Sequence, residues 1–162
     1  MKIDIGNFYI TDFCKENILH CRFRRQLASD SAFLQRGFYR IEEQLTEPTN
    51  KNKLEPNNSY IIEDKEGNLV GYLRLGNLNF IGTITLEYGI HKDFRGEKYA
   101  YPLPKELTDY ILKYMNDVKE IRGDISIYNV KSIKIAEGVG YQSNGRNDQN
   151  IDYRYSREGK KR

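Results

Sequence analysis

Residues 83–100 read TITLEYGIHKDFRGEKYA and combine an alternating segment, a polar turn and the start of a helical segment. From 83 to 90 the even positions are apolar and the odd ones are polar or Gly, the period of a half-buried strand. The turn that follows contains Gly96 and leads into a helix, whose first backbone N–H groups and positive dipole end suit an anion such as phosphate. Gly96 has a second interpretation, in which it simply serves the turn.

The residues before this stretch predict two short helices and a hairpin. Residues 15–45 carry apolar side chains at helical spacing, with an interruption near 29–31 where Ser and Asp side chains favour a helix start. Residues 47–58 hold two Pro and four Asn, which is typical of a surface loop. Residues 60–63 and 69–75 flank a short polar connection with a Gly, so with 83–90 they predict three consecutive antiparallel strands.

The residues after the stretch predict alternating helices and strands. Residues 100–115 are apolar at helical intervals, residues 121–127 form a strand pattern, 129–138 a helix pattern, and 153–155 suggest a last strand. The order of these segments predicts an α/β (α+β) fold, in which a central mixed, mostly antiparallel sheet is flanked by helices. We expect a single domain over residues 1–162.

Composition and charge argue against a nucleic-acid-binding protein and against a membrane protein. The chain has 162 residues and a net charge of +3, but residues 157–162 carry four of the 26 basic and one of the 23 acidic residues, so the remainder is neutral. We expect this basic tail to be disordered, and the neutral body argues against a nucleic-acid partner. No apolar run approaches the ~20 residues of a membrane span, and no signal core is present, which predicts a cytoplasmic protein without a membrane partner.

Cysteine and histidine offer little for a metal or a disulfide. Cys14 and Cys21 are seven residues apart, which favours two free thiols in a reducing compartment. His20 lies beside them and His91 is far along the chain, so a zinc site would lack ligands. We therefore predict no metal.

Two motifs resemble those of the GNAT superfamily of N-acetyltransferases. Residues 95–100, RGEKYA, are similar to its acyl-CoA motif Arg-Gly-x-Gly-x-Ala, which follows a strand and opens a helix. Residues 129–141, NVKSIKIAEGVGY, look like its second signature, with Asn, then Ser three residues on, then Gly and an aromatic residue. The Ser resembles the ribosomal-protein-alanine acetyltransferase-like branch, and the likeness covers about half of the chain, from 60 to 141.

The resemblance implies acetyl-CoA as co-substrate and a GNAT-like sheet. Backbone N–H groups of the four residues that open the helix would hold the pyrophosphate, with Arg95 as a positive neighbour and Gly96 in the turn. The pantetheine arm would bind along the strand that ends at Ile90, as an added strand does. The implied cofactor-binding residues are Ile90, Arg95, Gly96, Glu97, Lys98, Tyr99, Ala100, Asn129 and Ser132. Asn129 also suits a helix N-cap, and the two roles are compatible.

Two positions depart from the motif. Lys98 replaces the second motif Gly, and its side chain would either pair with phosphate or block the approach of the cofactor. Pro102 and Pro104 cannot both sit in a helix interior, so the helix would begin near Pro102 or kink at Pro104.

Acetyl transfer to an amine requires a neutral amine, a polarised thioester carbonyl and a proton for the leaving thiolate. An unperturbed Lys-like amine has a pKa near ~10.4, so a base is useful at neutral pH. Glu87 and His91 lie four residues apart on the polar side of the predicted strand, and we expect them to be the catalytic residues. The alternatives are a solvated strand carboxylate and a loop histidine. Many GNAT members have a Tyr at the position of Ala136, and Tyr99, Tyr128 and Tyr141 are unranked candidates for the acid.

We therefore expect an acetyl-CoA-dependent N-acetyltransferase that acts on a primary amine, a protein N-terminus or a small molecule, by direct attack in a ternary complex. A homodimer is a further expectation. One competing hypothesis is a non-catalytic acyl-CoA-binding or sensor domain on the same fold. Another is a nucleic-acid module, motivated by the basic tail and by residues 20–25.

Overall fold

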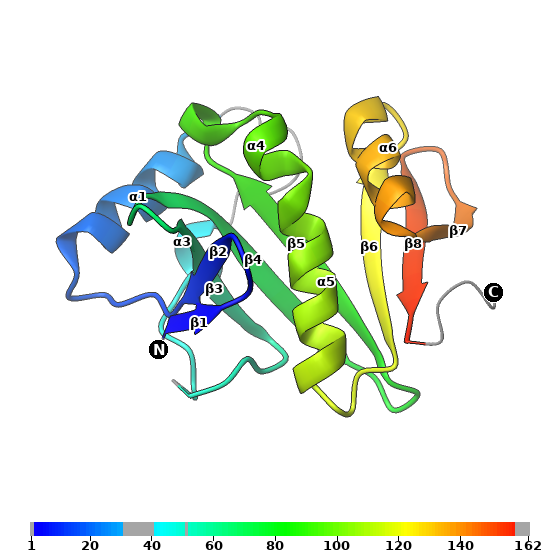
Figure 1. Cartoon of the computed structure of the whole chain (residues 1–162), viewed down its shortest axis with the longest axis horizontal. Helices are drawn as coiled ribbons and strands as arrows, with labels where there is room; N and C mark the ends of the chain where they lie inside the picture. The colour runs from blue at the N-terminus through cyan, green and yellow to red at the C-terminus, as the bar shows by residue number, and fades with distance from the viewer. Residues whose placement is uncertain (1, 31–40, 51, 158–162) are drawn as a thin grey trace.

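The computed structural model describes residues 2–30, 41–50 and 52–157 (Figure 1). Its strands are β1 Lys2–Asp4, β2 Phe8–Thr11, β3 Asn58–Asp64, β4 Leu69–Leu78, β5 Thr83–Ile90, β6 Glu120–Ser126, β7 Gln142–Arg146 and β8 Asn150–Ser156. Its helices are α1 Ile18–Ala28, α3 Ile41–Gln44, α4 Glu97–Ala100, α5 Pro102–Tyr114 and α6 Val130–Val139, with a 3₁₀ turn at Lys92–Phe94. No helix in these ranges is long and apolar enough to cross a membrane.

The strands form one sheet in the order β1-β2-β3-β4-β5-β6-β8-β7. Among the strands of the described residues only the β5–β6 pair is parallel, which confirms the predicted mixed, mostly antiparallel sheet flanked by helices. The three consecutive strands β3, β4 and β5 are confirmed as well. The sequence reasoning missed β1 and β2, whose three and four residues are too short to show a period. It also missed β7, and the last strand that it predicted at residues 153–155 is part of β8.

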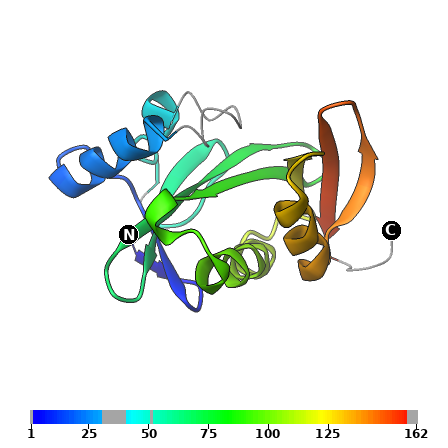
Figure 2. The ribbon, with the colours of Figure 1, turned by 90° about the horizontal axis from the view of Figure 1, so that it is seen from above.

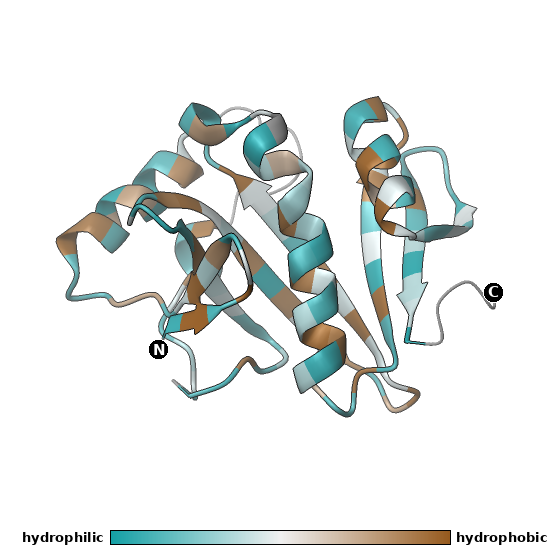
Figure 3. Cartoon of the chain, viewed as in Figure 1, coloured by the Kyte–Doolittle hydropathy of each residue, from teal (hydrophilic) through white to brown (hydrophobic). Residues whose placement is uncertain are grey.

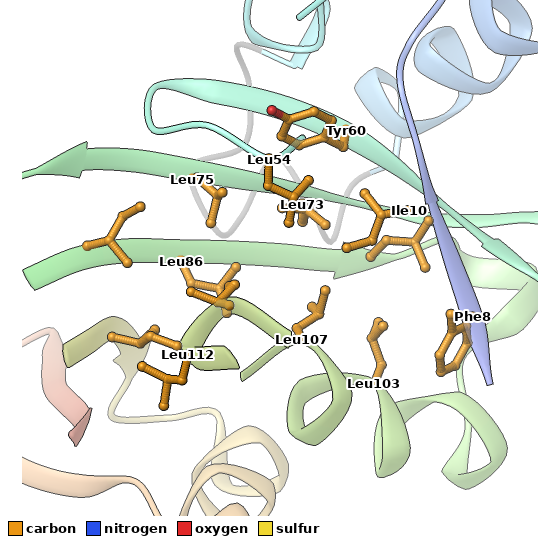
Figure 4. Packing of buried hydrophobic residues seen from close by; sticks show 14 of the residues in the cluster. Phe8, Ile10, Leu54, Tyr60, Leu73, Leu75, Leu86, Leu103, Leu107 and Leu112 are labelled. Carbon is orange, nitrogen blue, oxygen red and sulfur yellow. The ribbon is translucent and has the colours of Figure 1, made fainter. Parts of the chain in front are cut away.

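The main core lies between the sheet and α5 (Figures 2 and 4). Leu103, Leu107 and Ile111 of α5 are fully buried, and they pack with Leu73 of β4 and Ile84 of β5. Figure 3 shows brown and teal residues alternating along α5, as expected of an amphipathic helix. Each buried side chain of this size contributes about 1.5–3 kcal/mol, so α5 is held firmly against the strands that form the site.

Helices α1 and α3 cover the opposite face, near β3 and β4 (Figure 2). Phe23 and Leu27 of α1 and Ile41 of α3 form a second cluster with Ile61 of β3 and Tyr72 of β4. The predicted helix over residues 15–28 is thus confirmed in α1, while part of the second predicted helix falls at 31–40, outside the described residues.

The helical segment after the polar turn divides at Tyr101. Tyr101 separates α4 from α5, and α5 begins at Pro102, with Pro102 and Pro104 both in its first turn. Pro is tolerated there because the first N–H groups of a helix have no intrahelical partner. Of the two predicted outcomes, the late start near Pro102 is therefore the correct one.

The predicted tail begins with an anchored residue. The guanidinium of Arg157 donates to the backbone carbonyls of Leu112, Met115 and Val118, and the last of these bonds is 2.6 Å long. A cation at the C-terminal end of α5 also interacts favourably with the helix dipole. Residues 158–162 of the predicted tail lie outside the described part of the chain.

Strands β5 and β6 pair at one end and diverge at the other. Their parallel register runs over three pairs, from Thr83↔Glu120 to Thr85↔Arg122. In Figure 1 the two strands meet at the bottom of the sheet and spread apart toward α4 and α6. The sheet therefore has an open wedge between two central strands, and the residues from 86 to 90 and from 123 to 126 border it.

Candidate functional site

A cavity of about 940 Å³ occupies the wedge between β5 and β6. The turn before α4 and the first turns of α6 complete its walls. Seven of the residues predicted as functional line it: Glu87, Ile90, Arg95, Gly96, Ala100, Asn129 and Ser132. The structure thus brings together two motifs that are about thirty residues apart in the sequence.

The cavity is lined from both faces of the sheet. Leu86 and Glu87 are consecutive in β5, so their side chains point to opposite faces, and both line the cavity. Ala100, Pro104 and Ala136 line it from the side of the helices. One ligand could therefore bind against the helices and present its end to Glu87 through the wedge.

The turn before α4 leaves free space beside Gly96 and places Arg95 at the cavity wall. Gly96 has φ +145°, which side chains rarely adopt, and a Cβ built there would meet no atom within 4 Å. The Nε of Arg95 donates to the Ile90 carbonyl at 3.1 Å, and its Nη2 forms a 2.7 Å ion pair with the buried Asp30. Arg95 thus places a cation at the cavity wall and links it to the end of α1.

The edge of β5 that faces the wedge presents backbone groups at alternate residues. The His91 N–H donates to Val70 of β4 at 2.7 Å, so by the strand period the N–H groups of Leu86, Tyr88 and Ile90 point the other way, toward β6. This is the arrangement that an extended ligand needs to bind as an added strand.

Asn129 and Ser132 meet the cavity at the start of α6. The side-chain oxygen of Asn129 accepts the Ser132 N–H at 3.2 Å, so Asn129 is the N-cap of this helix. Both residues line the cavity as well. The predicted cap is therefore confirmed, and it places the Asn side chain where a ligand would lie.

Glu87 is exposed at the cavity, but its carboxylate is crowded by neighbouring strands. Desolvation by these neighbours raises its pKa, Arg74 of β4 opposes this rise, and Asp124 of β6 adds to it. A base with a raised pKa lies nearer to neutral pH, where proton transfer is most efficient.

His91 lies apart from Glu87. It is 5% exposed, its ring stacks on Phe23 of α1 at 5.6 Å between centroids, and Phe94 contacts it edge-on. Its Nδ1 accepts the Asp93 N–H at 3.1 Å, which caps the 3₁₀ turn. Among the described residues that line the cavity His91 is not found, because the chain turns at the end of β5 and directs the imidazole under α1.

Lys98 and Tyr99 point away from the wedge. They line a second, smaller cavity of about 240 Å³ near Asp64 and Phe8. The Tyr99 hydroxyl donates to Asp64 at 3.0 Å, and the Lys98 Nζ lies 5.4 Å from the Tyr99 ring centroid. Lys98 therefore neither reaches the larger cavity nor obstructs it. Glu97, the remaining predicted residue, is the first residue of α4.

The sequence reasoning missed the residues that β6 contributes. Gly123, Asp124 and Ser126 line the cavity opposite Glu87, because the parallel register with β5 places them there. The strand pattern over 121–127 indicated β6, but no local signal gave its partner. The order β5–β6 follows only from the packing of both strands against α5.

The structure separates the three tyrosines considered as the acid. Tyr99 is directed elsewhere, Tyr128 lines the mouth of the cavity and is 82% exposed, and Tyr141 lines its inner wall. The hydroxyl of Tyr141 is 2.6 Å from that of Thr108 on α5, and burial raises its pKa. Tyr141 and Tyr128 therefore remain as candidates, one inside the cavity and one at its rim.

Comparison with protein families gives one match. Residues 22–142 match the family described as acetyltransferase (GNAT) domain, which is about three quarters of the chain. A search of curated proteins finds no match.

Solved structures with the same fold include several acetyltransferases. An acetyltransferase of the GNAT family from Bacillus anthracis has a TM-score of 0.70 at 15% identity, over 98% of this chain and 99% of that one. An acetyltransferase from Agrobacterium tumefaciens has 0.67 at 16% identity, over 96% and 94%. A chimeric spermidine N-acetyltransferase from Vibrio cholerae has 0.70 at 16% identity, over 94% and 97%. At these identities the likeness shows the fold alone.

Proposed function

Because the chain belongs to the GNAT acetyltransferase family, we propose that it transfers an acetyl group from acetyl-CoA to a primary amine by direct attack in a ternary complex. The observation that carries this proposal is the cavity lined from both faces of the sheet. The motif residues lie on one side of it and a carboxylate with a raised pKa lies at the other, so a donor and an acceptor can meet within the wedge.

The residues around the cavity fit acetyl-CoA. Gly96 leaves room for phosphates at the turn, while Arg95 and Lys131 place cations along the wall and rim. The N–H groups of alternate β5 residues face the wedge and suit the amides of a pantetheine arm. When bound, acetyl-CoA supplies the thioester whose acetyl group is transferred.

Glu87 is the proposed base. Its carboxylate would accept a proton from the acceptor ammonium, directly or through one water, so that a neutral amine faces the wedge. Its position on the face of the sheet opposite α5 and α6 keeps the carboxylate away from the expected phosphate site. Because His91 is buried beneath α1, we assign it the role of shaping the turn rather than contacting the acceptor.

The cofactor claim is tested by thermal unfolding with acetyl-CoA. At one hundred times its Kd, acetyl-CoA should add about 2.7 kcal/mol of stability, which raises the Tm of a chain of this size by roughly 5–10 °C. ATP at the same concentration is the control for non-specific anion binding. The absence of a shift with any CoA thioester would refute the proposed co-substrate.

The catalytic claim is tested by Glu87→Gln with a panel of amines. We expect a loss in kcat of about 10²-fold or more, with the Kd for acetyl-CoA nearly unchanged. The panel includes a peptide that begins with Ala, since the ribosomal-protein-alanine branch stays a prediction, and spermidine, which the name of one structural neighbour suggests. Binding of acetyl-CoA without turnover of any amine would favour the competing sensor function, which is motivated by Lys98, the two prolines and Ala136.

A further inference from the structure

Three polar side chains form a row across β3, β4 and β5, on the face of the sheet opposite α5. The strand registers place Ser59 opposite Arg74 and Arg74 opposite Glu87. Directly opposed residues on neighbouring antiparallel strands have Cβ atoms about 4.5–5.5 Å apart. Arg74 therefore stands between a buried hydroxyl on one side and the proposed base on the other.

Arg74 is anchored on the side away from Glu87. Its Nη1 donates to the hydroxyl of Ser59 at 3.3 Å, and Ser59 is only 2% exposed. A guanidinium is planar and carries five N–H donors in fixed directions. Holding one of its nitrogens at Ser59 therefore limits where the remaining donors and the positive charge can lie.

Other groups that face Glu87 oppose the effect of Arg74 on its protonation state. Tyr72 of β4 lies beside it, and its buried phenol adds low-dielectric surroundings but no positive charge. Asp124 faces Glu87 from β6, and its own ion pair with Arg122 is 3.3 Å long. Burial and Asp124 both favour a protonated Glu87, whereas Arg74 favours the carboxylate.

We propose that Arg74 is a positioning residue, which keeps the Glu87 carboxylate ionised and oriented toward the acceptor amine, and that Ser59 fixes Arg74 for this task. This inference rests on the proposed function of Glu87 as the base. The advantage of such an arrangement is that the base keeps the partly desolvated surroundings that make it effective, while a fixed cation limits the rise of its pKa.

The test is the pH dependence of kcat/KM between pH 5 and 9. On the acid side of this profile, which we call the acid limb, kcat/KM falls as Glu87 is protonated. Arg74→Gln should move the acid limb to higher pH by about one unit, since a cation within ~4–6 Å lowers a carboxyl pKa by that order. Arg74→Lys should leave the acid limb close to its position in the parent, because it keeps the positive charge. Ser59→Ala, which removes only a hydroxyl, should shift the limb in the same direction by less.

A merely structural role of Arg74 would give a different result. In that case Arg74→Gln would reduce kcat/KM by the same factor at every pH, and its acid limb would lie at the same pH as in the parent. Arg146→Gln is the matched control, because Arg146 is an exposed arginine at the far end of the same sheet, on β7. A limb that moves equally in the control would also overturn the proposal.

A second measurement separates this inference from the proposed function. The carboxyl carbon of Glu87, assigned by comparison with Glu87→Gln, can be titrated by NMR in the ligand-free protein. A higher pKa in Arg74→Gln and Ser59→Ala than in the parent supports the coupling, even if no amine is acetylated, in which case only the proposed function fails. Turnover with an unchanged Glu87 titration in both variants overturns the role of Arg74.

Discussion

At the scale of single residues, His20 shows how burial makes one side chain sensitive to pH. It is 8% exposed, and its Nδ1 accepts the Cys14 N–H at 3.0 Å, so the folded chain requires a neutral imidazole. Burial lowers its pKa, while Asp12 and Glu63 oppose this effect. Between this lowered pKa and the unfolded value of about 6.5, the unfolded chain binds more protons than the folded one.

The free energy of unfolding should therefore fall as pH drops below about 6.5. Protonation of Nδ1 leaves the Cys14 N–H without its acceptor, which costs about 1–3 kcal/mol for a buried group. Urea unfolding at pH 7.5 and 5.5 measures the decrease in the free energy of unfolding. In His20→Gln the part of this decrease that comes from His20 should be absent. If the variant and the parent lose equal stability between the two pH values, His20 is not the group responsible.

At the scale of an element, the turn before α4 depends on the backbone of Gly96. Gly96→Ala should cost about 1–3 kcal/mol, because a side chain is strained at φ +145° even where space is open. It should also raise the Kd for acetyl-CoA severalfold, since the turn lines the cavity.

Gly145 provides the matched control. It has φ +121°, a Cβ there would meet nothing within 4 Å, and it lies on β7, away from the cavity. Gly145→Ala should cost a similar stability and leave the Kd unchanged. A similar rise in Kd for both variants would mean that loss of stability, and not the turn, controls binding.

The start of α6 allows the two roles of Asn129 to be separated. Asn129→Ala should lose the cap, at about 1 kcal/mol, and weaken acetyl-CoA binding. Asn129→Asp caps a helix equally well, so the Tm should be kept, but it removes the amide donor and adds a negative charge at the cavity. A preserved Tm with a raised Kd supports contact with the ligand. A preserved Kd in Asn129→Asp would restrict Asn129 to the cap.

At the scale of the whole molecule, the ligand should occupy the wedge between β5 and β6 and pair with the backbone of β5. Hydrogen exchange followed by NMR tests this, because acetyl-CoA should protect the amides of Tyr88 and Ile90, which face the wedge beyond the last β5–β6 pair. The amides of β2 and β3 pair with each other, far from the cavity, and should be unaffected. Equal protection of both regions would indicate a global stabilisation without binding along β5.

Local features of the site were readable from neighbouring residues in the sequence. The period of residues 83–90, the glycine in the turn, the prolines that start α5 and the Asn cap of α6 each act over a few residues, and the structure has them as predicted. The identity of the family was readable for the same reason, because its two motifs are short and continuous.

The directions of particular side chains were not readable in this way. Lys98 belongs to the motif but points to the second cavity, since Tyr99 beside it is held by Asp64 of β3. His91 continues the polar side of β5 in the sequence, yet Phe23 of α1 covers it. In both cases the deciding contact comes from a segment at least thirty residues away.

Sequence periodicity and turn chemistry thus specify which segments become strands and helices, and where the motif turn and its helix begin. Packing between distant segments decides the rest: the parallel register that sets Asp124 beside Glu87, the row from Ser59 to Glu87, and the wedge itself. The physical reason is that strand pairing and side-chain burial depend on surfaces that meet only in the folded chain. A pattern along the sequence specifies the faces of an element but not its partner.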